Sequence, residues 1–172
     1  MKKFLATLLS VAVLLTFAVF AIGSGDDEAT VSDGDSAVAD EVTEKQKNLT
    51  VNAGEVLEAG KLKITYVASG EYKDYSEYLA PKDGYKIIYI DLKAENIGSE
   101  DAYISTFEFT CYADDKAMES YYGAGDDISA TLSTGRSTSG KVYFEVPVNA
   151  ENIEIEYETD YWENEKAIFV VK

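Results

Sequence analysis

Adjacent carboxylates are the first residues of this chain whose spacing suggests chemistry. Asp114-Asp115 and Asp126-Asp127 both lie in polar, turn-forming stretches. Calcium takes about six to eight oxygen ligands, and converging loops can supply them. Neither pair has the spacing of a calcium-binding loop, so solvated turn residues are the more ordinary interpretation. If the chain binds a divalent cation, we expect Asp126 and Asp127 as ligands, because neighbouring glycines make their loop pliable.

Catalytic chemistry finds little support in the sequence. Histidine is absent, and with it the commonest general base and transition-metal ligand. Cys111 is the only cysteine; no cation closely flanks it, so we expect a buried structural thiol. Glu154 and Glu156 alternate along the wet face of a predicted strand, and no serine lies in a Gly-x-Ser-x-Gly elbow. We therefore expect no catalytic residue and no cofactor, with a secreted hydrolase as the least favoured alternative.

Tyrosine is the unusual feature of the composition, with 13 residues. Exposed Tyr and Trp side chains offer a large contact area at low entropic cost, and binding surfaces use them. Tyrosine also packs at the rims of sandwiches with its hydroxyl in water. The candidate binding residues lie in predicted loops or at strand ends, and they are Tyr72, Tyr75, Tyr78, Tyr121, Tyr122, Tyr161 and Trp162.

The N-terminus has the pattern of an export segment. Lys2 and Lys3 precede an apolar run over residues 4–22, and an acidic cluster follows it. The run is longer than the usual signal core of about 7–15 residues, and it falls within the roughly 17–25 that can span a bilayer. Residues 1–23 are therefore predicted to be a signal peptide or a membrane anchor. Either way, the charge asymmetry places the rest of the chain outside, extracellularly or at the cell surface.

Small residues mark a cleavage site between Gly23 and Ser24, because Ala21 and Gly23 stand three and one positions before the cut. This segment resembles a bacterial lipoprotein signal, in which a cysteine follows the small residue and carries the lipid. Ser24 stands at that position here, and a hydroxyl cannot form the thioether. Three alternatives remain open: cleaved secretion, descent from a lipoprotein, and an uncleaved anchor.

Residues 24–48 are predicted to be an acidic, disordered linker, because they contain many carboxylates and no aromatic residue. The whole chain has a formal net charge of −17. Such a surface repels phosphate backbones and anionic headgroups. We expect no nucleic-acid partner, and contact with the membrane only through the N-terminal segment.

From residue 49 onward, apolar and polar residues alternate with a period of two, which is typical of strands with one wet face. Turn-forming residues separate the runs, and a last run that is apolar on both faces indicates a central strand. The only helical candidate covers residues 71–79. About seven or eight strands favour an antiparallel β-sandwich over a barrel. The predicted strands cover residues 62–66, 88–94, 107–111, 142–146, 153–157 and 167–171.

Three stretches carry a family resemblance: residues 60–65, residues 81–96 with a strand ending at Asn96, and residues 133–147 ending in Phe-Glu-Val-Pro. Together they resemble the telokin-like, immunoglobulin-like domain of unknown function (DUF4352 type) of Gram-positive surface proteins and lipoproteins. The resemblance implies an all-β, immunoglobulin-like sandwich over residues 49–172, preceded by a signal and a polar linker. It implies no catalytic residue.

The expected function is therefore an exported, non-catalytic domain that binds a protein or a cell-envelope component. The tyrosine-rich loops would form the contact surface. A divalent-cation-binding envelope domain is the alternative. The residues specify no particular ligand, partner or oligomeric state.

Overall fold

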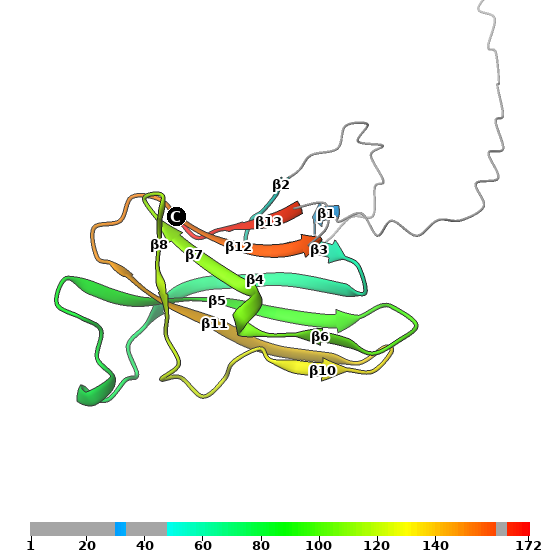
Figure 1. Cartoon of the computed structure of the whole chain (residues 1–172), viewed down its shortest axis with the longest axis horizontal. Coiled ribbons are helices and arrows are strands. Elements are labelled where there is room, and N and C mark those ends of the chain that lie inside the picture. Colours follow the sequence, from blue (N-terminus) through cyan, green and yellow to red (C-terminus); the bar gives the residue numbers. More distant parts are fainter. Residues whose placement is uncertain (1–29, 34–47, 161–164) are drawn as a thin grey trace, which may run out of the picture.

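The computed structural model describes residues 30–33, 48–160 and 165–172, and these form a β-sandwich (Figure 1). One sheet has six strands in the order β1-β3-β4-β5-β11-β9, and the other has five in the order β2-β13-β12-β7-β8. A separate pair, β10-β6, completes the structure. The predicted all-β sandwich is confirmed.

Strands and two 3-10 turns follow one another along the described part of the chain. In order they are β1 (Thr30–Asp33), β2 (Asn48–Val51), β3 (Glu55–Ala59), β4 (Leu62–Tyr72), η1 (Glu77–Leu79), β5 (Tyr85–Asn96), β6 (Ala102–Ile104), η2 (Thr106–Glu108), β7 (Phe109–Ala113), β8 (Lys116–Ala117), β9 (Glu119–Ser120), β10 (Ala130–Leu132), β11 (Ser137–Pro147), β12 (Ile153–Asp160) and β13 (Glu165–Val170).

Alternating apolar residues of both sheets face each other and form one continuous core. Tyr66 of β4 packs edge-on against Phe169 of β13, with ring centroids 5.5 Å apart. The Tyr66 hydroxyl donates a hydrogen bond of 3.0 Å to the carbonyl of Val170, so the buried phenol is satisfied. Each fully buried large apolar side chain contributes about 1.5–3 kcal/mol, and this contact joins the two sheets directly.

A β-bulge in β4 changes which residues face outward. The pairing of β4 with β5 shifts between Tyr66 and Ala68, and an extra residue reverses the alternation beyond that point. Before the bulge, Tyr66 faces the core. After it, Gly70 and Tyr72 pair with Tyr89 and Ile87 on the outer face. The bulge therefore places a tyrosine on the outside of the six-stranded sheet.

Most of the predicted strands are present, and the last one, β13, lies centrally between β2 and β12 as its pattern indicates. The prediction that Phe107 continues a strand with Phe109 and Cys111 is wrong. Ser105 and Glu108 form a capping box in which the Phe107 N–H donates to Ser105 Oγ and the Ser105 N–H donates to Glu108 Oε2. That box closes η2 and leaves Phe107 78% exposed.

The helical candidate at residues 71–79 forms only the single turn η1, because β4 extends to Tyr72. Short strands of two to four residues raise the number above the seven or eight expected. One of them, β1, lies within the predicted linker and pairs with β3. Among the described residues, no helix is long and apolar enough to cross a membrane.

Several predictions fall on residues whose placement the structure leaves undescribed. The signal or anchor at residues 1–23, with the cleavage site at Gly23 and Ser24, lies outside the described residues. Most of the linker at residues 24–48 does so too, as do Tyr161 and Trp162.

Candidate functional site

Most of the predicted binding tyrosines that the structure describes fall into two groups. One group packs together on the outer face of the six-stranded sheet, and we call it the tyrosine cluster. Its ring centroids are 5.2 Å apart for Tyr72 and Tyr143, 6.0 Å for Tyr72 and Tyr121, and 6.3 Å for Tyr72 and Tyr75. Tyr89 joins through Tyr143 at 5.9 Å. Tyr89 and Tyr143 were not predicted as site residues.

Strand register explains why these rings meet. Tyr143 of β11 pairs with Tyr89 of β5, which pairs with Gly70 of β4, so the three lie in one row on the outer face. A Cβ atom at Gly70 would lie 2.7 Å from the Tyr89 hydroxyl, so the Tyr89 ring lies across the glycine. Ile87 faces outward in the next row, and it is fully buried. The cluster is thus a small second core outside the sheet.

The loop between β9 and β10 (residues 121–129) is held against this cluster by charge. Lys141 Nζ donates to Asp126 Oδ2 at 2.5 Å, and the Tyr143 hydroxyl donates to Asp126 Oδ1. Lys141 Nζ also lies 5.2 Å from the centroid of the Tyr89 ring, a cation–π distance. The hydrogen bonds from Lys141 and then Tyr143 lower the pKa of Asp126. Burial, followed by the bond to Asp126, raises the pKa of Tyr143.

The two carboxylates predicted to bind a cation have separate partners. Asp126 is engaged by Lys141 and Tyr143, whereas Asp127 Oδ1 accepts a 3.0 Å hydrogen bond from the Ser129 N–H. Among the described residues, no group of three or more His, Cys, Asp or Glu side chains is arranged to hold a metal ion. Calcium binding at Asp126 and Asp127 stays a prediction.

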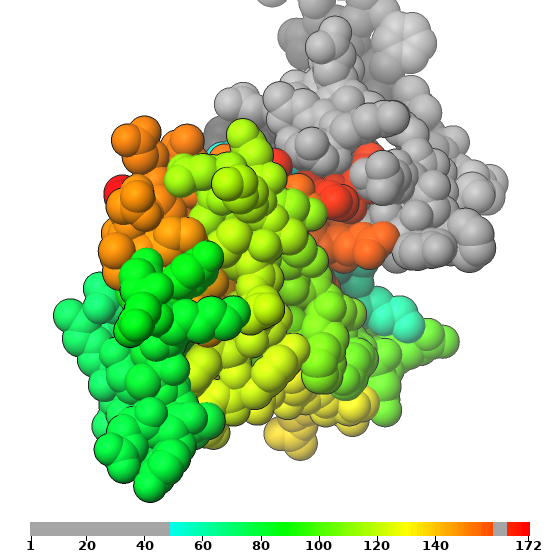
Figure 2. Space-filling view, turned by 60° about the vertical axis from the view of Figure 1, so that its left-hand side comes forward, coloured from blue at the N-terminus to red at the C-terminus, as the bar shows by residue number. Residues whose placement is uncertain are grey.

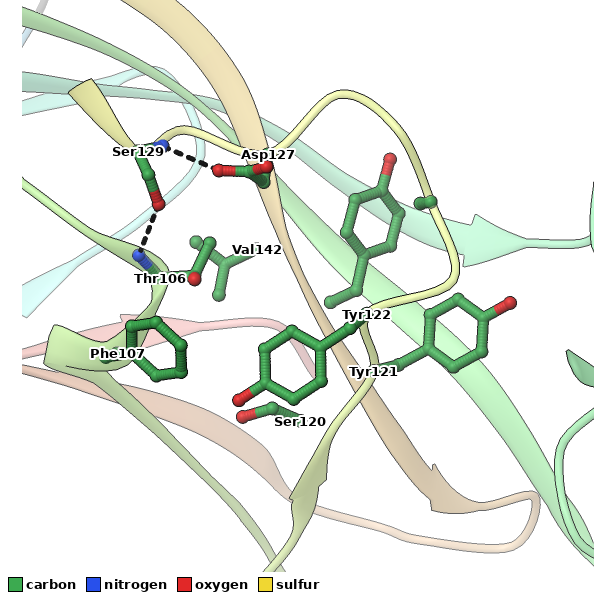
Figure 3. A pocket seen from close by; sticks show the side chains of 10 residues that line it. Thr106, Phe107, Ser120, Tyr121, Tyr122, Asp127, Ser129 and Val142 are labelled. Carbon is green, nitrogen blue, oxygen red and sulfur yellow. Dashed lines mark hydrogen bonds between the residues drawn. The ribbon is translucent and has the colours of Figure 1, made fainter.

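A second group of aromatic residues lies beside the cluster at a pocket. Phe107 of η2 and Tyr122 of the β9–β10 loop form what we call the pocket pair; their ring centroids are 5.9 Å apart at an interplanar angle of 39°. Tyr122 is 65% exposed, and Phe107 is more exposed still. Figure 3 shows the two rings next to each other. The pocket is about 260 Å³ in volume, and its lining residues are Thr106, Phe107, Ser120, Tyr121, Tyr122, Ala124, Asp127, Ser129, Val142 and Tyr143.

The lining combines an apolar base with hydroxyl groups and one carboxylate. Val142 and Tyr143 are almost fully buried, whereas Asp127 is exposed. Ser129 Oγ accepts a 3.2 Å hydrogen bond from the Thr106 N–H, which ties the β9–β10 loop to η2 (Figure 3). This hydrogen bond therefore connects η2, which carries Phe107, to the loop that carries Tyr122.

Phe107 is the residue of the pocket pair that the sequence prediction missed. Its alternation with Phe109 and Cys111 suggested a strand, but the Ser-x-x-Glu spacing at Ser105 and Glu108 is the signal of a capping box. That signal marks the start of a helical turn. A helical turn at this point breaks the alternation with Phe109 and indicates that Phe107 lies outside the core.

The remaining predicted tyrosine lies apart from both groups. Tyr78 is in η1, within the β4–β5 loop that projects from one end of the sandwich (Figure 1), and it is 88% exposed. Figure 2 shows this loop in green next to the yellow-green segment that leads into the β9–β10 loop, on one face of the molecule. Tyr72 at the base of the loop contacts Tyr121.

Cys111 is buried, as predicted, on the inner face of β7. Burial raises the pKa of its thiol to about 12, so the reactive thiolate is scarce at neutral pH. Cys111 acts as a small apolar core residue.

Comparison with known proteins identifies a family and a fold. The model of a family described as "Domain of unknown function (DUF4352)" matches residues 51–168. No curated protein matches the chain.

Solved structures with similar folds come from several bacteria. A Bacillus subtilis protein described as a "putative lipoprotein (ycdA)" has a TM-score of 0.56 at 13% identity; the match covers 67% of this chain but only 38% of that one. The secreted protein MPT63 of Mycobacterium tuberculosis has a TM-score of 0.52 at 14% identity, covering 72% and 97%. An uncharacterised β-sandwich protein of Clostridium difficile has a TM-score of 0.50 at 15% identity, covering 77% and 100%. These likenesses concern the fold.

Proposed function

We propose that this chain, which belongs to the DUF4352 family of domains of unknown function, is a non-catalytic binding domain that works outside the cytoplasmic membrane. Its contact surface is the pocket pair, Phe107 and Tyr122, with the pocket beside them. The partner is a component of the cell envelope.

The exposure of two adjacent aromatic rings carries this proposal. Phe107 and Tyr122 come from different elements and stand together with most of their surface in water. Aromatic side chains are enriched in binding surfaces because they bury much area while few rotatable bonds are ordered. The capping box holds η2, and the bond from Thr106 to Ser129 holds the loop. The surface is thus organised before any partner arrives, which lowers the cost of binding.

Two observations support a position outside the membrane. The structural neighbours include one protein described as a "putative lipoprotein" and one described as secreted. The apolar run at residues 4–22, preceded by Lys2 and Lys3, has the pattern of an export segment.

A binding role without catalysis agrees with the residues around the pocket. Among the described residues, Asp127 is the one carboxylate that lines the pocket, whereas glycoside hydrolysis uses a pair flanking the scissile bond. The sequence contains no histidine. The thiol of Cys111 is protonated and buried in the core.

Co-sedimentation with envelope fractions tests the proposal. The full chain, exported from a bacterial host and purified in mild detergent, is mixed with cell-wall sacculi or membrane vesicles from Bacillus subtilis. We expect the wild type to sediment with one of these fractions. The double variant Phe107→Ser/Tyr122→Ser should sediment at least about tenfold less, since truncating a central aromatic anchor costs about 2 kcal/mol or more.

Tyr78→Ser is the matched control, because it removes a ring that is more exposed than either ring of the pocket pair but lies on η1. It should sediment like the wild type. Absence of wild-type sedimentation with every fraction, or equal sedimentation of the double variant, would refute the proposed function.

A further inference from the structure

We propose that the pocket beside Phe107 and Tyr122 accepts one neutral, N-acetylated sugar ring of an envelope glycan. This inference rests on the proposed function and specifies its ligand. The features that carry it are the spacing of the two rings, the hydroxyl-rich rim, the apolar base and the charge of the lining.

Ring spacing determines how a ligand can stack. A flat group held between two aromatic planes needs about 7–8 Å between them, twice a contact separation of about 3.5–4.0 Å. The 5.9 Å between the centroids of Phe107 and Tyr122 is too short for that. A ligand in the pocket therefore stacks on one exposed ring face and is not held between the two rings. The C–H face of a pyranose ring matches such an exposed aromatic surface, as flat apolar groups do in general.

Hydroxyl groups surround the pocket in a way that suits a sugar. Ser120, Ser129 and Thr106 each present a group that can both donate and accept, as each sugar hydroxyl does. The Ser129 N–H donates to Oδ1 of Asp127, so Oδ2 can accept a charge-assisted hydrogen bond from a ligand hydroxyl.

The base of the pocket is apolar and small. Val142 is nearly fully buried there, and Ala124 lines the pocket beside it. These side chains suit the methyl group of an acetamido substituent. A volume of about 260 Å³ equals that of about eight or nine waters at about 30 Å³ each. The pocket can therefore hold one sugar ring, while the rest of a glycan chain stays outside.

Charge restricts the class of sugar. The lining residues that the structure describes include no Lys or Arg, and the chain has a formal net charge of −17. Anionic sugars and phosphate groups are repelled by Asp127 and by the overall field. A neutral sugar avoids this cost. A cationic ligand would need Asp127 as a counter-ion, so an Asp127→Asn variant distinguishes a cationic ligand from a neutral sugar.

Nuclear magnetic resonance titration provides the test. The isotope-labelled full chain in mild detergent is titrated with the tetrasaccharide of N-acetylglucosamine. We expect saturable shifts with a dissociation constant on the order of 1 mM, at residues of the β9–β10 loop and η2. Tyr122→Ala and Phe107→Ala should each weaken binding about tenfold, by analogy with the loss of one stacked base. Tyr78→Ala should stay within about twofold of the wild type.

Asp127→Asn separates a sugar from a cation. The Asn side chain still offers an oxygen acceptor to a neutral sugar, so the affinity for the tetrasaccharide should fall by less than about fivefold. A cation such as choline or tetralysine would lose its counter-ion and bind more weakly. Three outcomes would overturn the inference: no shift with the tetrasaccharide at about 10 mM, equal binding by the Tyr122→Ala variant, or shifts with choline or tetralysine only. If any one of these outcomes occurs while sedimentation still depends on Phe107 and Tyr122, the proposed function stands and the sugar assignment fails.

Discussion

The tyrosine cluster and the pocket pair are built from the same kinds of side chain, yet they differ in how far the rings are covered. In the cluster, Tyr143 is only 4% exposed, because neighbouring rings and the β9–β10 loop cover it. In the pocket pair, Phe107 and Tyr122 contact each other but remain largely in water. Tyr121 and Tyr122 are adjacent in sequence and fall into different groups. An abundance of tyrosine therefore does not by itself mark a binding surface.

Backbone position accounts for the difference. The cluster residues Tyr89 and Tyr143 stand directly opposite each other on paired strands, where side chains are about 4.5–5.5 Å apart and pack. The pocket pair stands on a 3-10 turn and a loop, and neither of these two segments belongs to a sheet in the described part of the chain. The rings of the cluster therefore cover one another, whereas the rings of the pair stay exposed to solvent.

The largest effect that would test this comparison is expected at Tyr143. Tyr143→Ala removes a buried ring that contacts three other tyrosines, and it should lower the free energy of unfolding by about 3–5 kcal/mol. Urea denaturation of the full chain measures this change. Tyr143→Phe is the control, because it keeps the ring and loses only the hydrogen bond to Asp126; about 0.5–1.5 kcal/mol is expected. A loss below 1 kcal/mol in Tyr143→Ala would show that the cluster is not a second core.

A smaller effect is expected where the cluster rests on the sheet. Gly70→Ala places a Cβ atom 2.7 Å from the Tyr89 hydroxyl, so the ring must lift away from its neighbours. We expect the free energy of unfolding to fall by about 1–3 kcal/mol. Gly125→Ala, in the β9–β10 loop, meets nothing within 4 Å and should change stability by less than about 0.5 kcal/mol. Equal effects of the two substitutions would argue against close packing of Tyr89 over Gly70.

The smallest effect concerns the charge that joins the loop to the cluster. The pKa of Asp126 is lowered in the folded state, chiefly by Lys141. Its contribution is therefore present above the unfolded pKa of about 3.9 and is lost as the pH falls through the lower folded value. Because Asp126 is half exposed, solvent screening limits this contribution to about 0.5–1 kcal/mol.

Unfolding at a series of pH values checks this prediction. At pH 7 the wild type should be more stable than Asp126→Asn, and the difference should vanish once the pH is well below 3.9. Lys141→Gln should lower the stability at pH 7 by the same amount. The double variant Asp126→Asn/Lys141→Gln should lose no more stability than either single variant. A difference that persists unchanged in acid would exclude the ion pair as its cause.

Sequence patterns predicted the strands of the core well, because period-two alternation reports directly on burial. Positions such as Ile90, Phe144 and Ile155 follow that pattern and are buried. The outer cluster could not be predicted in the same way. It depends on the bulge after Tyr66 and on which strands pair, and neither is encoded in one strand alone. The adjacent Ile87 and Ile88, both buried on opposite faces, are the one local sign that the sheet is covered on both sides.

The site itself was predicted only in part. Tyr122 was among the candidate binding residues, and the structure places it at the pocket. Phe107 was expected in the core, because alternation with Phe109 outweighed the capping box at Ser105. Tyr72, Tyr75 and Tyr121 were candidates as well, but the structure shows them packed against other rings. Local composition identified the residue type, whereas tertiary packing decided which rings stay exposed.

One paired measurement tests most directly whether the pocket pair, and not the tyrosine cluster, is the contact surface. Thermal unfolding and sedimentation with envelope fractions are measured on the wild type, on Phe107→Ser/Tyr122→Ser and on Tyr143→Ala. We predict that the pocket variant keeps the wild-type Tm within about 2 °C and loses binding at least about tenfold. Tyr143→Ala should lower Tm by about 6 °C or more. A pocket variant that unfolds several degrees earlier but still binds would contradict the account.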